Sequence, residues 1–196
     1  MKKIVALPMK KVKRELAEVA RIGQAFLDGD LFRRVLFPHA ERFLCGDDMD
    51  FDPAAFLPLK KTLLRLERVA RVPCSTALWR RRPDFPDCGE ALVYGFFGSP
   101  LGGPKPPRGY RPPRMFPELA AALLRGRPAW KLTPSAGARH MAERGAGLRV
   151  KGIRRPTFIQ LFAPFRDSLG ETAGALEVFA ADPGDEALPV KYEFWE

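Results

Sequence analysis

The sequence predicts an α+β fold in which helices come first and an antiparallel sheet follows. Hydrophobic residues recur at helical spacing up to about residue 71, and after Pro73 they alternate as in strands. Short turns join two pairs of the predicted strands, which indicates hairpins. Helices followed by hairpins are typical of the α+β class. We therefore expect a five-stranded antiparallel sheet with long N-terminal helices and one short flanking helix.

The 196 residues are predicted to form one domain. Hydrophobic residues make up 46% of the chain and charged residues 29%, which is a globular composition. The helical part is expected at 9–71, the sheet part at 73–181 and a C-terminal tail at 182–196.

The helical part divides into three predicted segments. Residues 9–29 form an amphipathic helix, and the sequence Asp28-Gly29-Asp30 ends it. A second helical pattern continues to about residue 45. The third helix opens with Asp52 as its N-cap and Pro53 in its first turn.

The first predicted hairpin pairs residues 74–81 with 90–96. A Gly/Pro-rich loop follows at 95–113, and such long loops are often functional. A short helix at 116–125, closed by Gly126, then leads into a strand at 129–132.

The last hairpin pairs residues 157–166 with 173–180 through a turn at 167–171. By strand alternation, its side chains divide between two faces. One face carries Phe158, Gln160, Phe162, Glu177 and Phe179. The other carries Ile159, Leu161, Ala163, Leu176 and Val178. Since both faces are largely apolar, this hairpin is expected at the centre of the sheet, covered on both sides.

The residue types predict neither an enzyme nor a cofactor. The histidines and cysteines, His39, His140, Cys45, Cys74 and Cys88, have no zinc-binding spacing. A haem or metal sensor that uses His39 or Cys45 is left open as an alternative, since both residue types can ligate haem iron. No catalytic triad or phosphate-binding glycine loop is recognisable. No apolar run is long enough for a membrane span or a signal peptide, which predicts a cytoplasmic protein. A periplasmic location would require a signal or anchor that these residues do not contain.

The net charge of +10 leaves nucleic acid open as an alternative partner. A nucleic-acid-binding or scaffold protein would use the basic segments Lys10–Arg14 and Arg149–Arg155. A protein-interaction module without a ligand is a further alternative.

Three segments together resemble the single Cache domain, a PAS-like sensor fold. The hairpin Phe162–Val178 (FAPFRDSLGETAGALEV) is similar to the family's final hairpin, and Tyr110–Phe116 (YRPPRMF) is similar to its loop before the third strand. The helix at 59–71 that leads into strand 74–81 is similar to its lead-in. The resemblance implies a non-enzymatic domain that binds a small ligand. It also implies that Arg114, or the nearby Arg111, reaches a ligand carboxylate, for which a guanidinium is well shaped.

Other candidate ligand contacts follow from the predicted strands. Trp79, Tyr94, Trp130 and Phe162 could wall a pocket, although large aromatic residues are more often plain core. Gln160 and Glu177 share a face and could orient a ligand or pair with a core arginine such as Arg80. Lys131 lies where the resemblance implies a further ligand contact. We expect a small organic, anionic ligand, a homodimer formed through the N-terminal helix and a signalling partner in trans.

Overall fold

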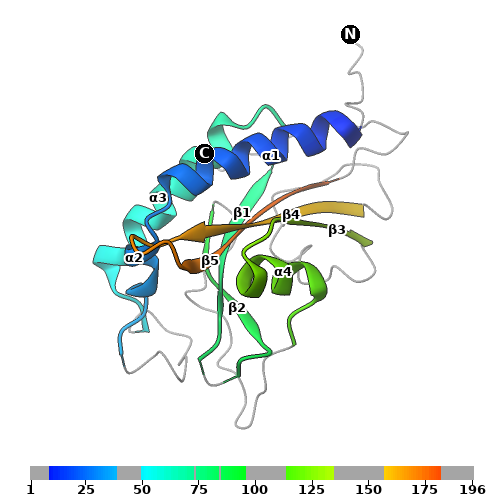
Figure 1. The fold of residues 1–196 in the computed structure, drawn as a ribbon. Coiled ribbons are helices and arrows are strands. Elements are labelled where there is room, and N and C mark those ends of the chain that lie inside the picture. Colours follow the sequence, from blue (N-terminus) through cyan, green and yellow to red (C-terminus); the bar gives the residue numbers. More distant parts are fainter. Residues whose placement is uncertain are drawn as a thin grey trace.

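The structure, a computed structural model, describes residues 9–38, 50–72, 74–83, 85–95, 114–134 and 157–181. Its helices are α1 (Met9–Phe26), α2 (Gly29–Arg33), α3 (Pro53–Val69) and α4 (Pro117–Arg125). Its strands are β1 (Ser75–Arg81), β2 (Gly89–Tyr94), β3 (Ala129–Pro134), β4 (Thr157–Arg166) and β5 (Thr172–Ala181). The five strands form one antiparallel sheet, with α1 and α3 on one side and α4 on the other (Figure 1). The predicted α+β class and five-stranded antiparallel sheet are confirmed.

The strand order is β2-β1-β5-β4-β3, so the last strand in the sequence lies at the centre of the sheet. β1 pairs with β2 through a short connection and with β5 across a long stretch of chain, where Ala77 faces Glu177. The predicted central position of the β4–β5 hairpin is confirmed, because both of its strands have a neighbour on each side.

The β4–β5 hairpin has the register that its alternation predicts. Phe162 faces Glu177, and the two predicted faces of the hairpin are confirmed. In the turn, Gly170 has a φ of 80°, a conformation that side chains disfavour. The Asp167 carboxylate accepts hydrogen bonds from the backbone N–H groups of Leu169 and Glu171, which fixes the turn.

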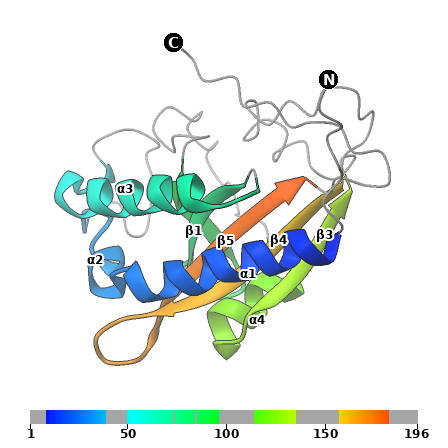
Figure 2. The ribbon, with the colours of Figure 1, turned by 90° about the horizontal axis from the view of Figure 1, so that it is seen from above.

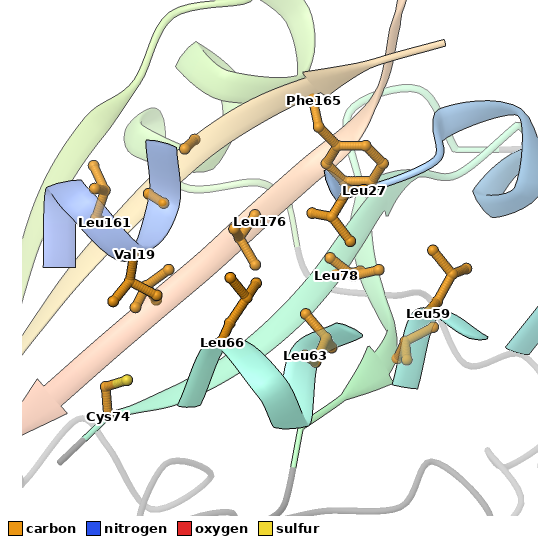
Figure 3. Close-up of a cluster of buried hydrophobic side chains, with 14 of the residues drawn as sticks. Val19, Leu27, Leu59, Leu63, Leu66, Cys74, Leu78, Leu161, Phe165 and Leu176 are labelled. Atoms are coloured by element: carbon orange, nitrogen blue, oxygen red, sulfur yellow. The ribbon is translucent and has the colours of Figure 1, made fainter. Parts of the chain in front are cut away.

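The main core lies between the sheet and the helices α1 and α3, on what we call the α1/α3 face. Seen from above, α1 and α3 both cross the strands (Figure 2). Val19 of α1, Leu66 of α3 and Leu176 of β5 meet there (Figure 3). Gly23 lies where α1 comes closest to the sheet, and a Cβ at this position would overlap the Leu176 side chain.

The apolar stripe of α1 is part of this core. Its buried residues are Val12, Leu16, Val19, Ala20 and Gly23. The stripe predicted as a dimer surface is therefore covered within the chain, and dimerisation stays a prediction.

The helix ends follow their capping residues. Asp52 caps α3 as predicted, because its carboxylate accepts a hydrogen bond from the Ala54 backbone N–H at 2.9 Å. α1 ends at Phe26, three residues before the predicted end, since Asp28 is extended and caps α2 instead. Gly126 closes α4 in the left-handed conformation, with a φ of 60°.

Several predicted features lie outside the described residues. These are residues 39–45 of the second helical segment, the loop at 96–113, the segment Arg149–Arg155 and the tail at 182–196. The prediction of helix over residues 34–38 is wrong, because α2 ends at Arg33 and Leu36 forms an antiparallel bridge with Phe51. Among the helices that the structure does describe, none has the length and apolar character needed to cross a membrane.

Candidate functional site

Four hydrogen-bonded polar side chains cross the sheet on the face that α4 covers, which we call the α4 face. The Trp79 indole N–H donates to Oε2 of Glu177 at 2.6 Å. The Gln160 amide N–H donates to Oε1 of Glu177 at 2.7 Å. The Thr133 hydroxyl donates to the amide oxygen of Gln160. We call Trp79, Glu177, Gln160 and Thr133 the polar row, because they come from β1, β5, β4 and β3 in turn.

Strand register brings the polar row together. Gln160 pairs with Phe179 and Lys131, so Glu177 and Thr133 are its diagonal neighbours on either side. Trp79 faces Ala175, two positions from Glu177 on the same face. Diagonal neighbours on one face of a sheet are within reach of long side chains.

The polar row is buried. Glu177 has no exposed surface, and Gln160 is only 3% exposed. Burying a carboxylate away from water is costly, and hydrogen bonds to the carboxylate recover only part of that cost. The central sheet therefore carries an acidic side chain where an apolar side chain would avoid this cost of burial.

An aromatic cluster lies beside the polar row. The rings of Phe116 and Phe162 meet edge to face with centroids 5.1 Å apart. Trp79 contacts both, at 6.3 Å from Phe116 and 6.4 Å from Phe162. Lys131 places its ammonium group 3.5 Å from the centre of the Phe116 ring, a cation–π contact. Phe162 is buried, whereas Trp79, Phe116 and Lys131 are half-buried and form the accessible rim of the site.

Five of the predicted ligand contacts thus lie together on the α4 face. They are Trp79, Lys131, Gln160, Phe162 and Glu177. Tyr94 is half-buried on the edge strand β2, and because its partner Ala77 also pairs with Glu177, it points to the α4 face as well.

Three predicted contacts are not part of this group. Trp130 is on β3 but points to the α1/α3 face, since its neighbour Lys131 points to the α4 face. The Arg114 side chain is 79% exposed and pairs with Asp87 at 3.0 Å. Arg111 lies outside the described residues.

Arg80, considered as a partner for the Gln160–Glu177 pair, lies on the opposite face. Its guanidinium forms an ion pair with Glu90 at 2.6 Å, and Glu90 also binds Arg82 at 2.8 Å. The alternation of β1 explains this, because Trp79 points to the α4 face and the next residue points away.

Sequence reasoning missed Thr133 and Phe116 as members of the site. The strand containing Thr133 was predicted to stop at 132, although Thr133 is two residues from Lys131 and so shares its face. The sequence places Phe116 at the start of the short helix predicted over 116–125, and in the structure it is the N-cap residue of α4.

The described residues contain no cluster of three histidine, cysteine or acidic side chains that could hold a metal ion. His39, Cys45 and His140 lie outside them. Cys74 and Cys88 are buried thiols, and burial raises the pKa of Cys74 well above its ordinary value.

Comparison of the chain with protein-family models, with curated proteins and with solved structures found no match.

Proposed function

We propose that this chain is a non-enzymatic sensor domain of the single Cache, PAS-like type, and that it binds a small organic anion on the α4 face. The observation that carries the proposal is the polar row, which sets a buried carboxylate and amide beside a partly exposed aromatic rim. Ligand sites in proteins are mostly apolar with a few fixed polar groups, and this face has that composition. The helices that precede a five-stranded antiparallel sheet also agree with the resemblance in the sequence.

The polar row supports binding rather than folding alone. Replacing a buried charged network with apolar residues is often neutral or stabilising, so folding by itself does not require Glu177 here. The hydrogen bonds that Glu177 accepts from Trp79 and Gln160 hold the Trp79 ring and the Gln160 amide in fixed orientations. A ligand on this face would meet the half-buried Trp79 ring in an orientation that is already fixed, which lowers the entropic cost of binding.

We assign the cationic anchor of this site to Lys131. It is half-buried, lies over Phe116 and is paired in register with Gln160. Arg114, which the resemblance implies for this role, is exposed and paired with Asp87. An acidic group on the ligand would bind the Lys131 ammonium while the body of the ligand packs on Phe116 and Trp79.

Signal output requires that the ligand favour one of two states of the domain. The central hairpin offers a direct connection, because Glu177 points to the α4 face while its neighbours Leu176 and Val178 pack in the core with α1 and α3. Ligand binding at the polar row would thereby bias the packing of α1, and a signalling partner in trans would detect that change.

A thermal-shift screen against small organic acids, amino acids, purines and haem tests the proposal. At a concentration of about one hundred times Kd, a ligand that binds only the folded state adds about 2.7 kcal/mol, which raises Tm by roughly 5–10 °C in a chain of this size. We expect an organic acid to give this shift in the parent and in Arg114→Ala, and to lose it in Lys131→Met.

The two variants separate the outcomes. A shift lost in Arg114→Ala but kept in Lys131→Met would return the anchor to Arg114. A shift from neutral compounds alone would contradict an anionic ligand. No shift from any class would contradict the sensor proposal and favour a protein-interaction module without a ligand.

A further inference from the structure

A second surface lies on the other side of the molecule, where the first turns of α1 meet β3. Lys13 of α1 contacts Trp130 of β3, the exposed Lys10, Lys11 and Arg14 continue around the first turns of α1, and Leu132 is exposed on the same face of β3 as Trp130. We call these six residues the basic-aromatic patch. Trp130 is 37% exposed and Leu132 is 50% exposed, both on the α1/α3 face of β3. The Lys13 ammonium lies 5.5 Å from the centre of the Trp130 ring. Figure 2 shows the first turns of α1 lying over β3.

The positive charge of this patch exceeds the negative charge of the acidic residues of α1, Glu15 and Glu18. Glu18 is paired with Arg21 at 2.7 Å, and Glu15 accepts a hydrogen bond from the backbone N–H of Arg71. Within the described part of the chain, no ion pair joins the four cations of the patch to a carboxylate. The first turn of α1 contains no acidic residue, although acidic residues are the ones that stabilise this end of a helix.

The patch also has an exposed aromatic ring at the edge of the sheet. β3 is the outermost strand in the order β2-β1-β5-β4-β3, and Trp130 and Leu132 extend beyond the core. Cations that follow a phosphate backbone, together with an aromatic ring on which a base can stack, are the two features of sequence-tolerant single-strand binding.

We infer that the basic-aromatic patch binds single-stranded nucleic acid. The net charge of +10 provides long-range attraction to a polyanion. Lys10, Lys11 and Arg14 would contact phosphates, and Trp130 would stack on a base once the Lys13 side chain moves aside. An anionic membrane is less well matched, because the apolar stripe of α1 is buried in the core and is not available to insert into lipid.

Fluorescence anisotropy with a labelled oligothymidylate of about 15 nucleotides tests this inference. Binding is measured from about 50 to 200 mM NaCl, beside a duplex of equal length. We expect the single strand to bind more tightly than the duplex. Trp130→Ala should weaken single-strand binding about tenfold, whereas Trp130→Phe should retain most of the affinity because a ring is kept.

The chain offers a matched control for charge. The triple variant Lys10→Gln/Lys11→Gln/Arg14→Gln removes three exposed cations from the patch, and Lys61→Gln/Arg65→Gln/Arg68→Gln removes three exposed cations from α3. The first should reduce the steepness of the salt dependence by about 2 in log–log slope, and the second should change it little. All six positions are on the surface, and thermal melts verify that the variants fold.

Equal loss in the two triple variants would show attraction to net charge alone and would overturn the inference. Equal binding of duplex and single strand with no effect of Trp130→Ala would overturn it too, as would binding to anionic vesicles without binding to the oligonucleotide. The patch is on the opposite face from Lys131, so Lys131→Met should leave oligonucleotide binding unchanged whatever the ligand screen shows.

Discussion

Glu177 is a buried carboxylate whose two oxygens accept hydrogen bonds from different strands, Oε2 from Trp79 and Oε1 from Gln160. A hydrogen bond to a charged group contributes more than one between neutral groups, and its loss leaves the charge less well solvated. A substitution of Glu177, Trp79 or Gln160 should therefore change both the stability of the fold and the geometry of the proposed site. The same reasoning makes Gln160 the residue through which the polar row can be tested.

We expect Gln160→Met to lower the free energy of unfolding by about 2–3 kcal/mol, because it removes a hydrogen bond from a buried carboxylate. Gln160→Met should lower the free energy of unfolding by less in the Glu177→Met background than in the parent, since the carboxylate that Gln160 binds is then absent. Urea unfolding of the parent, both single variants and the double variant gives the coupling energy. Additive effects would show that the Gln160–Glu177 hydrogen bond contributes no net stability.

Among the elements, the short helix α2 is attached to the β4–β5 turn by charge. Arg33 forms ion pairs with Asp167 at 2.7 Å and with Glu171 at 3.2 Å. The loss of solvent raises the pKa of Asp167, but hydrogen bonds from the Glu171 backbone and the Arg33 guanidinium outweigh that effect and hold this pKa below its ordinary value of 3.8. The attachment should therefore depend on pH.

Because the pKa of Asp167 is lower in the folded state, its contribution to stability is present above pH 3.8 and is lost as the pH falls through the folded-state value. We expect the stability difference between the parent and Asp167→Asn to be constant near neutral pH and to shrink in acid. Urea midpoints of both proteins between about pH 3 and pH 7 measure this difference. A difference that does not change with pH would show that the ion pair leaves the pKa of Asp167 unaltered.

On the scale of the whole molecule, Cys74 lies in the main core, so the rate at which its thiol is labelled measures how often the molecule unfolds. This thiol is 1% exposed, and burial raises its pKa, so the reactive thiolate is scarce in the folded state. In the variant Cys45→Ser/Cys88→Ser, we expect Cys74 to react with iodoacetamide only when the chain opens. The labelling rate should fall in the presence of a stabilising ligand. If iodoacetamide labelled Cys74 in the native protein as fast as in the urea-unfolded protein, the core around Cys74 would open locally, without global unfolding.

The sequence predicted much of the fold, because its signals are local. The cap at Asp52, the turn at Gly170 and the alternation of β4 and β5 each depend on a few neighbouring residues. The pairing of β1 with β5 depends on contacts between distant segments, and no local pattern predicts it.

The candidate site was predicted in part for the same reason. Gln160, Phe162 and Glu177 lie on long strands whose alternation assigns a face to each residue. Trp130 is on a shorter strand whose predicted residues, 129–132, were too few to indicate the face. Arg114 followed from the resemblance alone, and the structure pairs it with Asp87 at the surface.

The central position of β5 also sets the order in which the protein can be completed during its synthesis. When β1 leaves the ribosome it can pair with β2, but its other edge stays open until residues 82–181, which end with β5, have been translated. At typical rates of elongation this takes about 5–20 s. An open strand edge is a template for pairing with other chains. We therefore expect the nascent protein to be most prone to aggregation, and most dependent on chaperones, before β5 is synthesised.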